Sequence, residues 1–220
     1  YKLVKKDKDI WLASVGNIAD WHKPDFFKDF IKKYPGLANK DDKTEDILFK
    51  SELGKIAKIF FLILKNNTTI VNKCINLLAK INNPYEILNQ ETEDAKFIYT
   101  RAQKIWKKYD AILAKALQIK PDKNFVIFIY SSESMSFTGE IANELNYVHK
   151  NKVIFVGRTK DDKVNFSLRS EKVKVLPILE KAINGLDGSG GGHDNAVGGS
   201  INVNDFSKFI TNLRKIINKT

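Results

Sequence analysis

Apolar residues recur at helical spacing along the first half of the chain, between residues 8 and 120. The expected helices cover residues 10–20, 26–34, 56–64, 68–81 and 91–117. Pro35-Gly36 ends the second of these, and Asn82-Asn83-Pro84 interrupts the chain before the last. The last helix is long and amphipathic, and its polar face carries many lysines. The first half of the chain is therefore predicted to be helical.

The pattern changes at Pro121. Residues 125–130 and 153–156 are apolar runs rich in β-branched and aromatic side chains, as in buried strands, and residues 164–168 alternate like a third strand. Further segments follow with helical spacing at 137–149, 175–183 and 206–217 and with a short strand at 201–203. We expect Asn204 or Asp205 to be the N-cap of the last helix. These elements predict an α/β fold class, in which a helical connector region precedes a small α/β domain with a mixed or parallel sheet.

The charge of the chain is unusual for its ordinary hydrophobic content. The 220 residues carry a formal net charge of +11, almost wholly from lysine. Such a balance favours a polyanionic partner such as nucleic acid, or else reflects a lysine-rich surface from a biased genome. Arginines stand at four positions: Arg101, Arg158, Arg169 and Arg214. Because arginine binds phosphate with a planar fork, their placement is informative.

Other features of composition bear on where the protein works. The one cysteine, Cys74, lies in an apolar helical pattern and is expected to be a buried thiol. The longest apolar run, residues 59–64, is too short for a membrane span, and no signal peptide is evident, so we expect a cytoplasmic protein without a membrane partner. The chain opens at Tyr1 without methionine and soon reaches an apolar helix, which suggests a fragment or a processed piece.

The densest chemical signal is a run of glycines around one histidine, Gly188-Ser-Gly-Gly-Gly-His-Asp-Asn-Ala-Val-Gly-Gly-Ser200, which holds half of the chain's 12 glycines. Glycine lets backbone N–H groups approach an anion without a Cβ in the way, and a histidine ring can donate to phosphate oxygen. The alternative is a flexible linker, but a linker gains nothing from His-Asp-Asn. The run fits neither the P-loop nor the dinucleotide fingerprint.

A second signal is Asn165-Phe-Ser-Leu-Arg-Ser170, at the end of a predicted strand. A strand end can hold the guanidinium of Arg169 rigidly enough to contact phosphate. The alternative is an ordinary exposed arginine.

Together the two segments resemble the DHH-associated C-terminal domain of DHH-family phosphoesterases, which include RecJ-type exonucleases, oligoribonucleases and cyclic-dinucleotide phosphodiesterases. The resemblance implies that Arg169, Ser167 and His193 bind the substrate's phosphate and sugar, and that Gly191 and Gly192 supply backbone donors. Val197-Gly198 stands where the family commonly has Ala-Gly.

A third segment, Leu12-Ala-Ser-Val-Gly-Asn-Ile-Ala-Asp20, resembles the last motif of the DHH domain. The resemblance implies that Asp20 binds Mn²⁺ or Mg²⁺, hard ions that prefer carboxylate oxygen. The alternative is a helix with a close-packing glycine and a terminal acid. On the family reading, residues 1–40 end the DHH domain, residues 41–120 connect, and residues 121–220 form the substrate-binding domain, an order most like that of archaeal RecJ-like proteins.

The departure from the family is large. The chain has no Asp-x-Asp motif at the start of a DHH domain and no Asp-His-His triplet, and His22, His149 and His193 are isolated. A two-metal site needs several converging ligands. We expect this chain alone to be inactive and to need an N-terminal DHH half, either a missing segment or a separate polypeptide.

The resulting hypothesis is the C-terminal part of a metal-dependent phosphodiesterase, a single-strand-specific exonuclease on DNA or RNA. One alternative is a catalytically inactive replication adaptor that binds the GINS complex or single-stranded nucleic acid. Another is a phosphodiesterase of short oligonucleotides or cyclic dinucleotides, which has less need of an extended basic surface.

Overall fold

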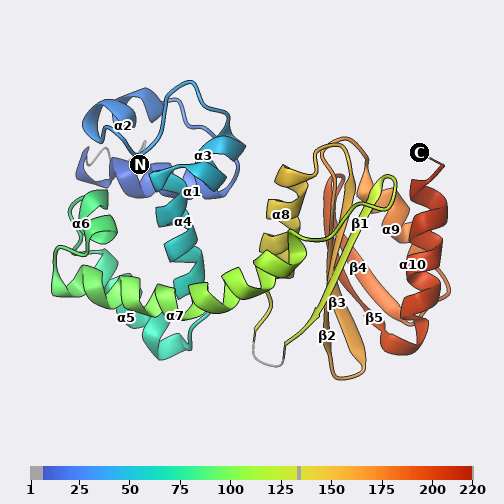
Figure 1. Cartoon of the computed structure of the whole chain (residues 1–220). Coiled ribbons are helices and arrows are strands. Elements are labelled where there is room, and N and C mark those ends of the chain that lie inside the picture. Colours follow the sequence, from blue (N-terminus) through green and yellow to red (C-terminus); the bar gives the residue numbers. More distant parts are fainter. Residues whose placement is uncertain (1–6, 133–134, 220) are drawn as a thin grey trace. The chain divides into compact units, whose positions relative to one another are not determined.

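The computed structural model describes residues 7–132 and 135–219. The chain forms two compact units, Tyr1–Lys108 and Tyr109–Thr220, and the 24-residue helix α7 (Glu93–Ala116) runs across the boundary between them. The first unit is helical and the second is α/β (Figure 1). The predicted fold class, helices first and a small α/β domain after them, is confirmed.

The first unit consists of short helices in sequence before α7. They are the 3₁₀ helix η1 (Asp7–Asp9), α1 (Ile10–Ala19), α2 (Phe27–Lys33), α3 (Thr44–Lys50), α4 (Glu52–Ile63), α5 (Thr68–Leu78) and α6 (Pro84–Asn89). Helices α3 and α6 were not predicted. The supposed break at Asn82-Asn83-Pro84 starts α6, because the Asn83 side chain accepts a hydrogen bond from the N–H of Glu86, 3.1 Å away, and Pro84 fits the first turn.

The core of this unit forms around α4, which packs against α1 and α3. Trp11, Ile59 and Leu62 are fully buried, of which the helical spacing in the sequence had selected Ile59. Gly54 allows the close approach of α3 and α4, since a Cβ there would collide with the backbone oxygen of Leu48. Helix positions are therefore set by apolar spacing and by one small residue at a contact.

The second unit is a mixed five-stranded sheet with the order β1-β2-β3-β5-β4. Its elements are β1 (Phe125–Ser131), α8 (Thr138–Val148), β2 (Val153–Lys160), β3 (Lys163–Arg169), α9 (Val175–Ile183), β4 (Gly188–His193), β5 (Ala196–Asn202) and α10 (Val203–Ile217). Strands β1 and β2 are parallel and joined through α8, whereas all other pairs are antiparallel. Helix α8 is the crossover between the parallel strands, short hairpins join β2 to β3 and β4 to β5, and α9 connects β3 to β4.

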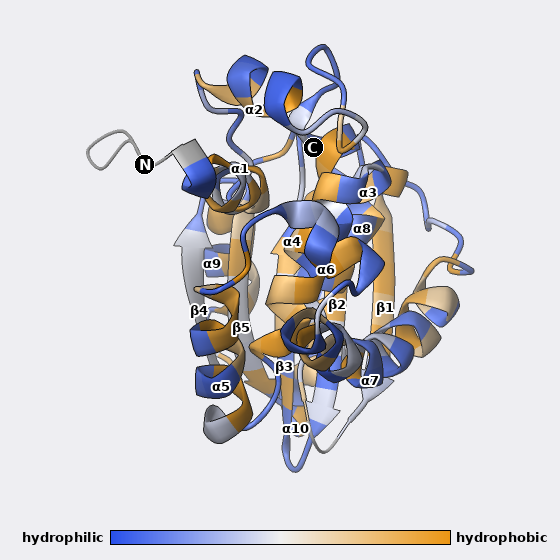
Figure 2. Ribbon diagram, turned by 90° about the vertical axis from the view of Figure 1, so that its left-hand side faces the viewer, coloured by the Kyte–Doolittle hydropathy of each residue, from blue (hydrophilic) through white to orange (hydrophobic). Residues whose placement is uncertain are grey.

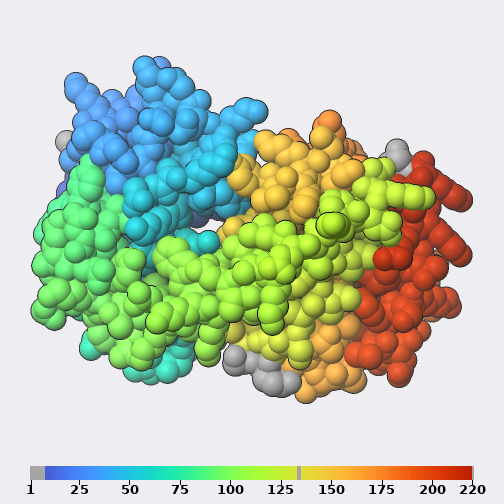
Figure 3. Space-filling view, in the orientation of Figure 1, coloured from blue at the N-terminus to red at the C-terminus, as the bar shows by residue number. Residues whose placement is uncertain are grey.

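The two faces of the sheet are covered differently. Helix α8 packs on β2 and β3 from one side, and α9 and α10 cover β3, β5 and β4 from the other (Figure 1). In the core Phe155 and Phe166 stack, and Phe209 of α10 packs against both rings. The outward face of α10, red in Figure 3, is exposed and carries Lys208, Thr211 and other polar side chains. The main contacts of α8 are with β2 and β3, whereas β4 and β5 pack chiefly against α9 and α10.

Two details differ from the sequence prediction. The N-cap of α10 is Asn202, whose side chain accepts from the N–H of Asn204, so neither Asn204 nor Asp205 caps the helix. The glycine-rich run forms a strand pair, β4 and β5, instead of an anion-binding loop or a linker. Strand β4 is pale in Figure 2 because glycine is nearly neutral in hydropathy, so no apolar alternation marks it.

None of the helices that the structure describes combines the length and the apolar character that a membrane span requires.

Candidate functional site

Strand register brings the predicted phosphate-binding residues of the second unit together. Arg169 on β3 faces Ala196 on β5, and Ala196 faces His193 on β4. The next row on the same face joins Ser167, Gly198 and Gly191. Directly opposed residues of antiparallel strands point to one face, so the Cα atoms of Arg169 and His193 lie roughly 10 Å apart across two strand spacings.

The Arg169 side chain is held in place from three sides. Its Nε donates to Oδ1 of Asn143 on α8 at 3.0 Å, and its Nη1 donates to the carbonyl oxygens of Leu168 at 3.0 Å and Val197 at 2.8 Å. Burial lowers the pKa of the guanidinium, and the Glu140 carboxylate acts in the opposite direction. Nη2 has no hydrogen-bond partner within the ranges that the structure covers. One donor of a fixed cation therefore stays available.

That donor lies at the start of α8. A Cβ built on Gly139 would be 3.8 Å from Nη2 of Arg169 and 3.8 Å from Oγ of Ser167. Ser167 is only 6% exposed, and its hydroxyl has no hydrogen-bond partner in the described part of the chain. The first turn of a helix also presents N–H groups without intrahelical partners and the positive end of the helix dipole. These groups together suit a bound phosphate or carboxylate oxygen.

The glycines of β4 and β5 fall into two classes. A Cβ on Gly190 would meet Leu179 of α9 at 3.0 Å, and one on Gly199 would press against the Ser189 backbone and the Phe166 ring. Those glycines are required by packing. A Cβ on Gly191 would meet nothing within 4 Å, and one on Gly198 only an ordinary contact at 3.5 Å. Packing does not require these two glycines, and they leave a side-chain-free strip beside the row that joins Arg169, Ala196 and His193.

The hairpin tip is fixed by its own polar groups. Nδ2 of Asn195 donates to the carbonyl oxygens of Ser170 at 2.9 Å and Val173 at 3.2 Å, and Lys174 pairs with Asp194 at 3.0 Å. Gly192 has φ +145°, which favours glycine. The Asp and Asn of the His-Asp-Asn sequence thus shape the turn, and the exposed His193 alone extends at the rim.

Gly191 and Gly192 lie in the edge strand, and this changes the interpretation of their backbone. In a strand, successive N–H groups point to opposite sides within the plane of the sheet, so they do not converge on one anion as in a glycine-rich loop. The structure therefore supports a different role for these glycines: because they have no side chains, they allow a ligand to approach the strand closely. Their assignment as donors stays a prediction.

Asp20, the predicted metal ligand, lies in the first unit at the C-terminal end of α1. It is exposed, as is Gly16 one turn earlier, and a Cβ on Gly16 would meet nothing within 4 Å. The close-packing alternative for this glycine is therefore wrong. Within residues 7–132 and 135–219, no group of three His, Cys, Asp or Glu could hold a metal ion. Asp20 offers one suitable oxygen ligand, and the residues present do not complete a metal site.

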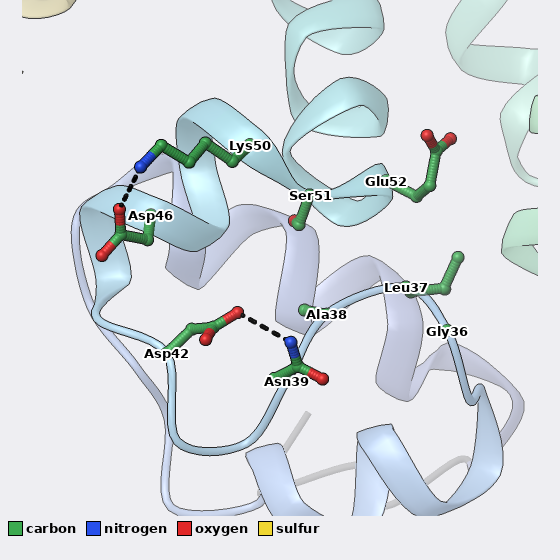
Figure 4. Close-up of a pocket in the computed structure, with 9 residues that line it drawn as sticks. All are labelled: Gly36, Leu37, Ala38, Asn39, Asp42, Asp46, Lys50, Ser51 and Glu52. Atoms are coloured by element: carbon green, nitrogen blue, oxygen red, sulfur yellow. Dashed lines mark hydrogen bonds and ion pairs between the residues drawn. The ribbon is translucent and has the colours of Figure 1, made fainter.

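A hollow of the first unit lies away from Asp20. It has a volume of about 540 Å³ and is lined by residues 36–39 and by Asp42, Asp46, Lys50 and Glu52, among others (Figure 4). Lys50 pairs with Asp46 at 3.1 Å, and Asn39 donates to Asp42 at 3.2 Å. These contacts partly neutralise the hollow, and none of the predicted site residues lines it.

Sequence reasoning missed several residues that build the site. Asn143 orients Arg169, Gly139 opens the start of α8, and Asn195 fixes the hairpin tip. Arg158 on β2 is half-buried, and its Nε is buried without a hydrogen-bond partner among the described residues. It faces Asn165 across the strands and lies two residues beyond the strand expected at 153–156. The role of Asn143 was not visible in the sequence, because it depends on a contact 26 residues away.

Comparison with known proteins agrees with this architecture. Residues 122–219 match the family model described as the DHHA1 domain. RecJ from Thermus thermophilus, in complex with Mg²⁺, aligns over 97% of this chain and 35% of its own with a TM-score of 0.62 and 18% identity. An exonuclease RecJ bound to manganese aligns over 97% of this chain and 55% of its own, with a TM-score of 0.60 and 15% identity.

A third structure extends the comparison beyond RecJ. The pGpG-specific phosphodiesterase PggH from Vibrio cholerae aligns over 86% of this chain and 67% of its own, with a TM-score of 0.58 and 14% identity. The chain thus spans about a third of the length of the Thermus protein, and at these identities the likeness shows the fold. No curated protein matches. Residues 122–219 therefore match the DHHA1 domain, and the chain has the fold of the corresponding part of these RecJ structures.

Proposed function

We propose that this chain is the substrate-gripping C-terminal portion of a metal-dependent DHH phosphodiesterase, a single-strand-specific exonuclease on DNA or RNA. The observation that carries the proposal is the open strip at Gly191 and Gly198, bordered by the fixed Arg169 and the exposed His193. A sugar–phosphate unit can lie flat on a strand only where no side chain intervenes. The match of residues 122–219 to the DHHA1 domain supports this assignment.

Arg169 acts in this proposal as a preorganised cation. Its three hydrogen bonds hold the guanidinium before the ligand arrives, so that Nη2 can donate to a phosphate oxygen with little loss of entropy. The Ser167 hydroxyl and the first turn of α8 supply further donors beside it. Arg169 and Ser167 would hold the phosphate, and His193 would contact it or the sugar from the rim.

The described residues do not complete a metal site, so most of the metal ligands would come from outside this chain. Divalent metal activates water and stabilises charge in such hydrolases when it is bound. The RecJ structures that resemble this chain hold Mg²⁺ or Mn²⁺. Asp20 would contribute one carboxylate, and an N-terminal DHH half would contribute the rest. We therefore expect the chain by itself to bind substrate without hydrolysing it.

The test of substrate binding uses the chain and a 5′-phosphorylated thymidine dinucleotide, followed by NMR titration. Arg169→Ala is expected to weaken binding by about 10- to 100-fold, since a charge-assisted hydrogen bond contributes about 1.5–3 kcal/mol. Gly191→Val is expected to weaken it similarly by covering the strip. Arg214→Ala removes an exposed arginine of the same unit, which pairs with Asp122 at 3.6 Å, and should leave binding unchanged.

The proposal fails if Arg169→Ala and Arg214→Ala bind the dinucleotide equally well. An adaptor function would instead leave the dinucleotide unbound by the unaltered chain. The role of Asp20 is tested in the enzyme completed by its DHH half. There Asp20→Ala should abolish Mn²⁺-dependent hydrolysis, whereas the exposed Asp41→Ala should retain it.

A further inference from the structure

A second concentration of positive charge lies in the helical unit, in a groove of about 500 Å³ between α5 and α7. Its lining includes Lys73, Phe97, Arg101 and Lys104. Arg101 and Lys104 are three positions apart on α7 and therefore share a face of the helix. None of the predicted site residues lies here.

The cations of this groove are arranged around one aromatic ring. Nζ of Lys73 lies 4.2 Å from the centroid of the Phe97 ring, and Cζ of Arg101 lies 4.8 Å from it. Burial raises the pKa of the neighbouring Cys74 thiol, while Arg101 and Lys73 both act to lower it. Cation–π contacts orient both charges but do not neutralise them.

Acidic partners are lacking for these cations. Lys73, Arg101 and Lys104 make no salt bridge or hydrogen bond with any residue that the structure describes, although Lys50, Lys55 and Lys96 of the same unit are paired. The two carboxylates of the groove stand in the first turn of α7, where the helix dipole stabilises them, and Glu93 is already paired with Lys96 at 2.7 Å. Like charges held together without a counter-ion repel, and a bound anion would relieve this.

We propose that Lys73, Arg101 and Lys104 form a binding site for the phosphate backbone of single-stranded nucleic acid, separate from the strip on the sheet. From Phe97 to Lys104 the groove follows α7 for roughly 10 Å, enough for a short stretch of backbone. Cations flank the Phe97 ring, so the contact is with phosphates and carries no base sequence. That the ligand is single-stranded nucleic acid rests on the proposed function. That the groove binds an anion rests only on its three cations.

The experiment follows binding of a fluorescein-labelled oligothymidylate to the whole chain by fluorescence anisotropy at several NaCl concentrations. The test variant is K73E/R101E/K104E. The matched control K28E/K40E/K43E reverses three lysines of the same unit outside the groove and has the same net charge. Thermal melting checks that both fold, and if the test variant does not, K73Q/R101Q/K104Q replaces it.

The groove variant is expected to bind at least about 10-fold more weakly than the control near 50 mM salt. Its plot of log affinity against log salt should be shallower by about 2, since each single-strand phosphate contact contributes about 0.7 to the slope. Equal losses in both variants would overturn the inference, because only net charge would then matter. The inference would also be overturned if polyglutamate competed as well as unlabelled oligothymidylate. That result would indicate an acidic protein partner.

The same variants separate this inference from the proposed function. The groove variant should still bind the phosphorylated dinucleotide, and Arg169→Ala should lose the dinucleotide while keeping most of the salt dependence for the long strand. If Arg169→Ala leaves dinucleotide binding intact and the groove variant loses the strand, the proposed function fails and the groove site stands. The opposite result removes the groove site alone.

Discussion

Arg169 and Arg101 lie in different units and are supported in opposite ways. Arg169 is half-buried among partners that fix three of its N–H directions, and one nitrogen remains for a ligand. Arg101 has no hydrogen bond to a described residue and rests on the face of Phe97, 4.8 Å from the ring centroid. Both are arginines beside an open surface in a basic chain.

The two proposed sites therefore differ in how they would bind phosphate. A fixed guanidinium has already lost its entropy during folding and selects one geometry, so it suits a site where a single phosphate must be positioned. A loosely held cation gains mainly from releasing counter-ions and is weakened by salt. As proposed, the sheet site would position a single phosphate, and the helical groove would bind the strand through its charge.

The most decisive way to break this comparison is the same substitution at both positions. Arg169→Lys should weaken binding of the phosphorylated dinucleotide by about 10- to 100-fold, because an ammonium cannot contact Asn143 and two carbonyl oxygens while also donating to a ligand. Arg101→Lys keeps the charge and should change oligothymidylate affinity by less than about 2-fold. NMR titration and anisotropy measure the two effects. Similar losses at both sites would contradict the distinction.

A smaller effect is expected when the support of each arginine is removed. Asn143→Ala takes away the acceptor of Nε and should weaken dinucleotide binding by about 5- to 10-fold, since one hydrogen bond contributes about 1 kcal/mol. Phe97→Leu keeps an apolar side chain beneath Arg101 and should alter strand binding very little. If Asn143→Ala binds the dinucleotide normally, Arg169 does not depend on α8 for its orientation.

The smallest expected effect concerns the packing on which α8 depends. The Tyr109 hydroxyl donates to the Glu144 carboxylate at 2.7 Å, and burial, followed by the charge of Glu144 and this bond, raises the pKa of Tyr109 well above its usual value of 10.0. A raised pKa in the folded state gives stability that is present below pH 10 and is lost as the pH rises above it. Tyr109→Phe should cost about 1 kcal/mol at neutral pH and reduce the alkaline loss. Urea unfolding at pH 7 and above pH 10 measures both, and an unchanged alkaline loss would assign it to other groups.

Much of the fold was predictable because its signals are local. Apolar spacing identified α7, α8 and α9, and apolar runs identified β1 and β2, since both patterns follow from one repeat length. The β4–β5 hairpin was missed because glycine has neither strand propensity nor hydrophobic alternation, and what holds it is the packing of α9 and the pairing with β3. Short helices such as α3, with seven residues, were missed because two turns are too short to show a helical period.

The ligand-facing residues of the candidate site were predictable from the sequence. The residues that hold them in place were less so. Arg169, Ser167 and His193 do lie on one face of one sheet, and their family pattern was sufficient to select them. Asn143 and Gly139 could not be selected, because their importance arises only when α8 folds onto β3. The metal assignment of Asp20 stays a prediction, since it depends on groups that this chain does not supply.

The tip of the β4–β5 hairpin also affects how the domain can open. The carbonyl oxygen of Asp194 accepts the N–H of Val175 at 2.6 Å and of Leu176 at 3.3 Å, so the tip caps the first turn of α9. Val175 is fully buried, and α9 is part of the core. Lifting the tip therefore frays a core helix, and the glycine strand cannot move as an independent flap. Its protection against amide hydrogen exchange should approach that of the core, which is unusual for a segment so rich in glycine.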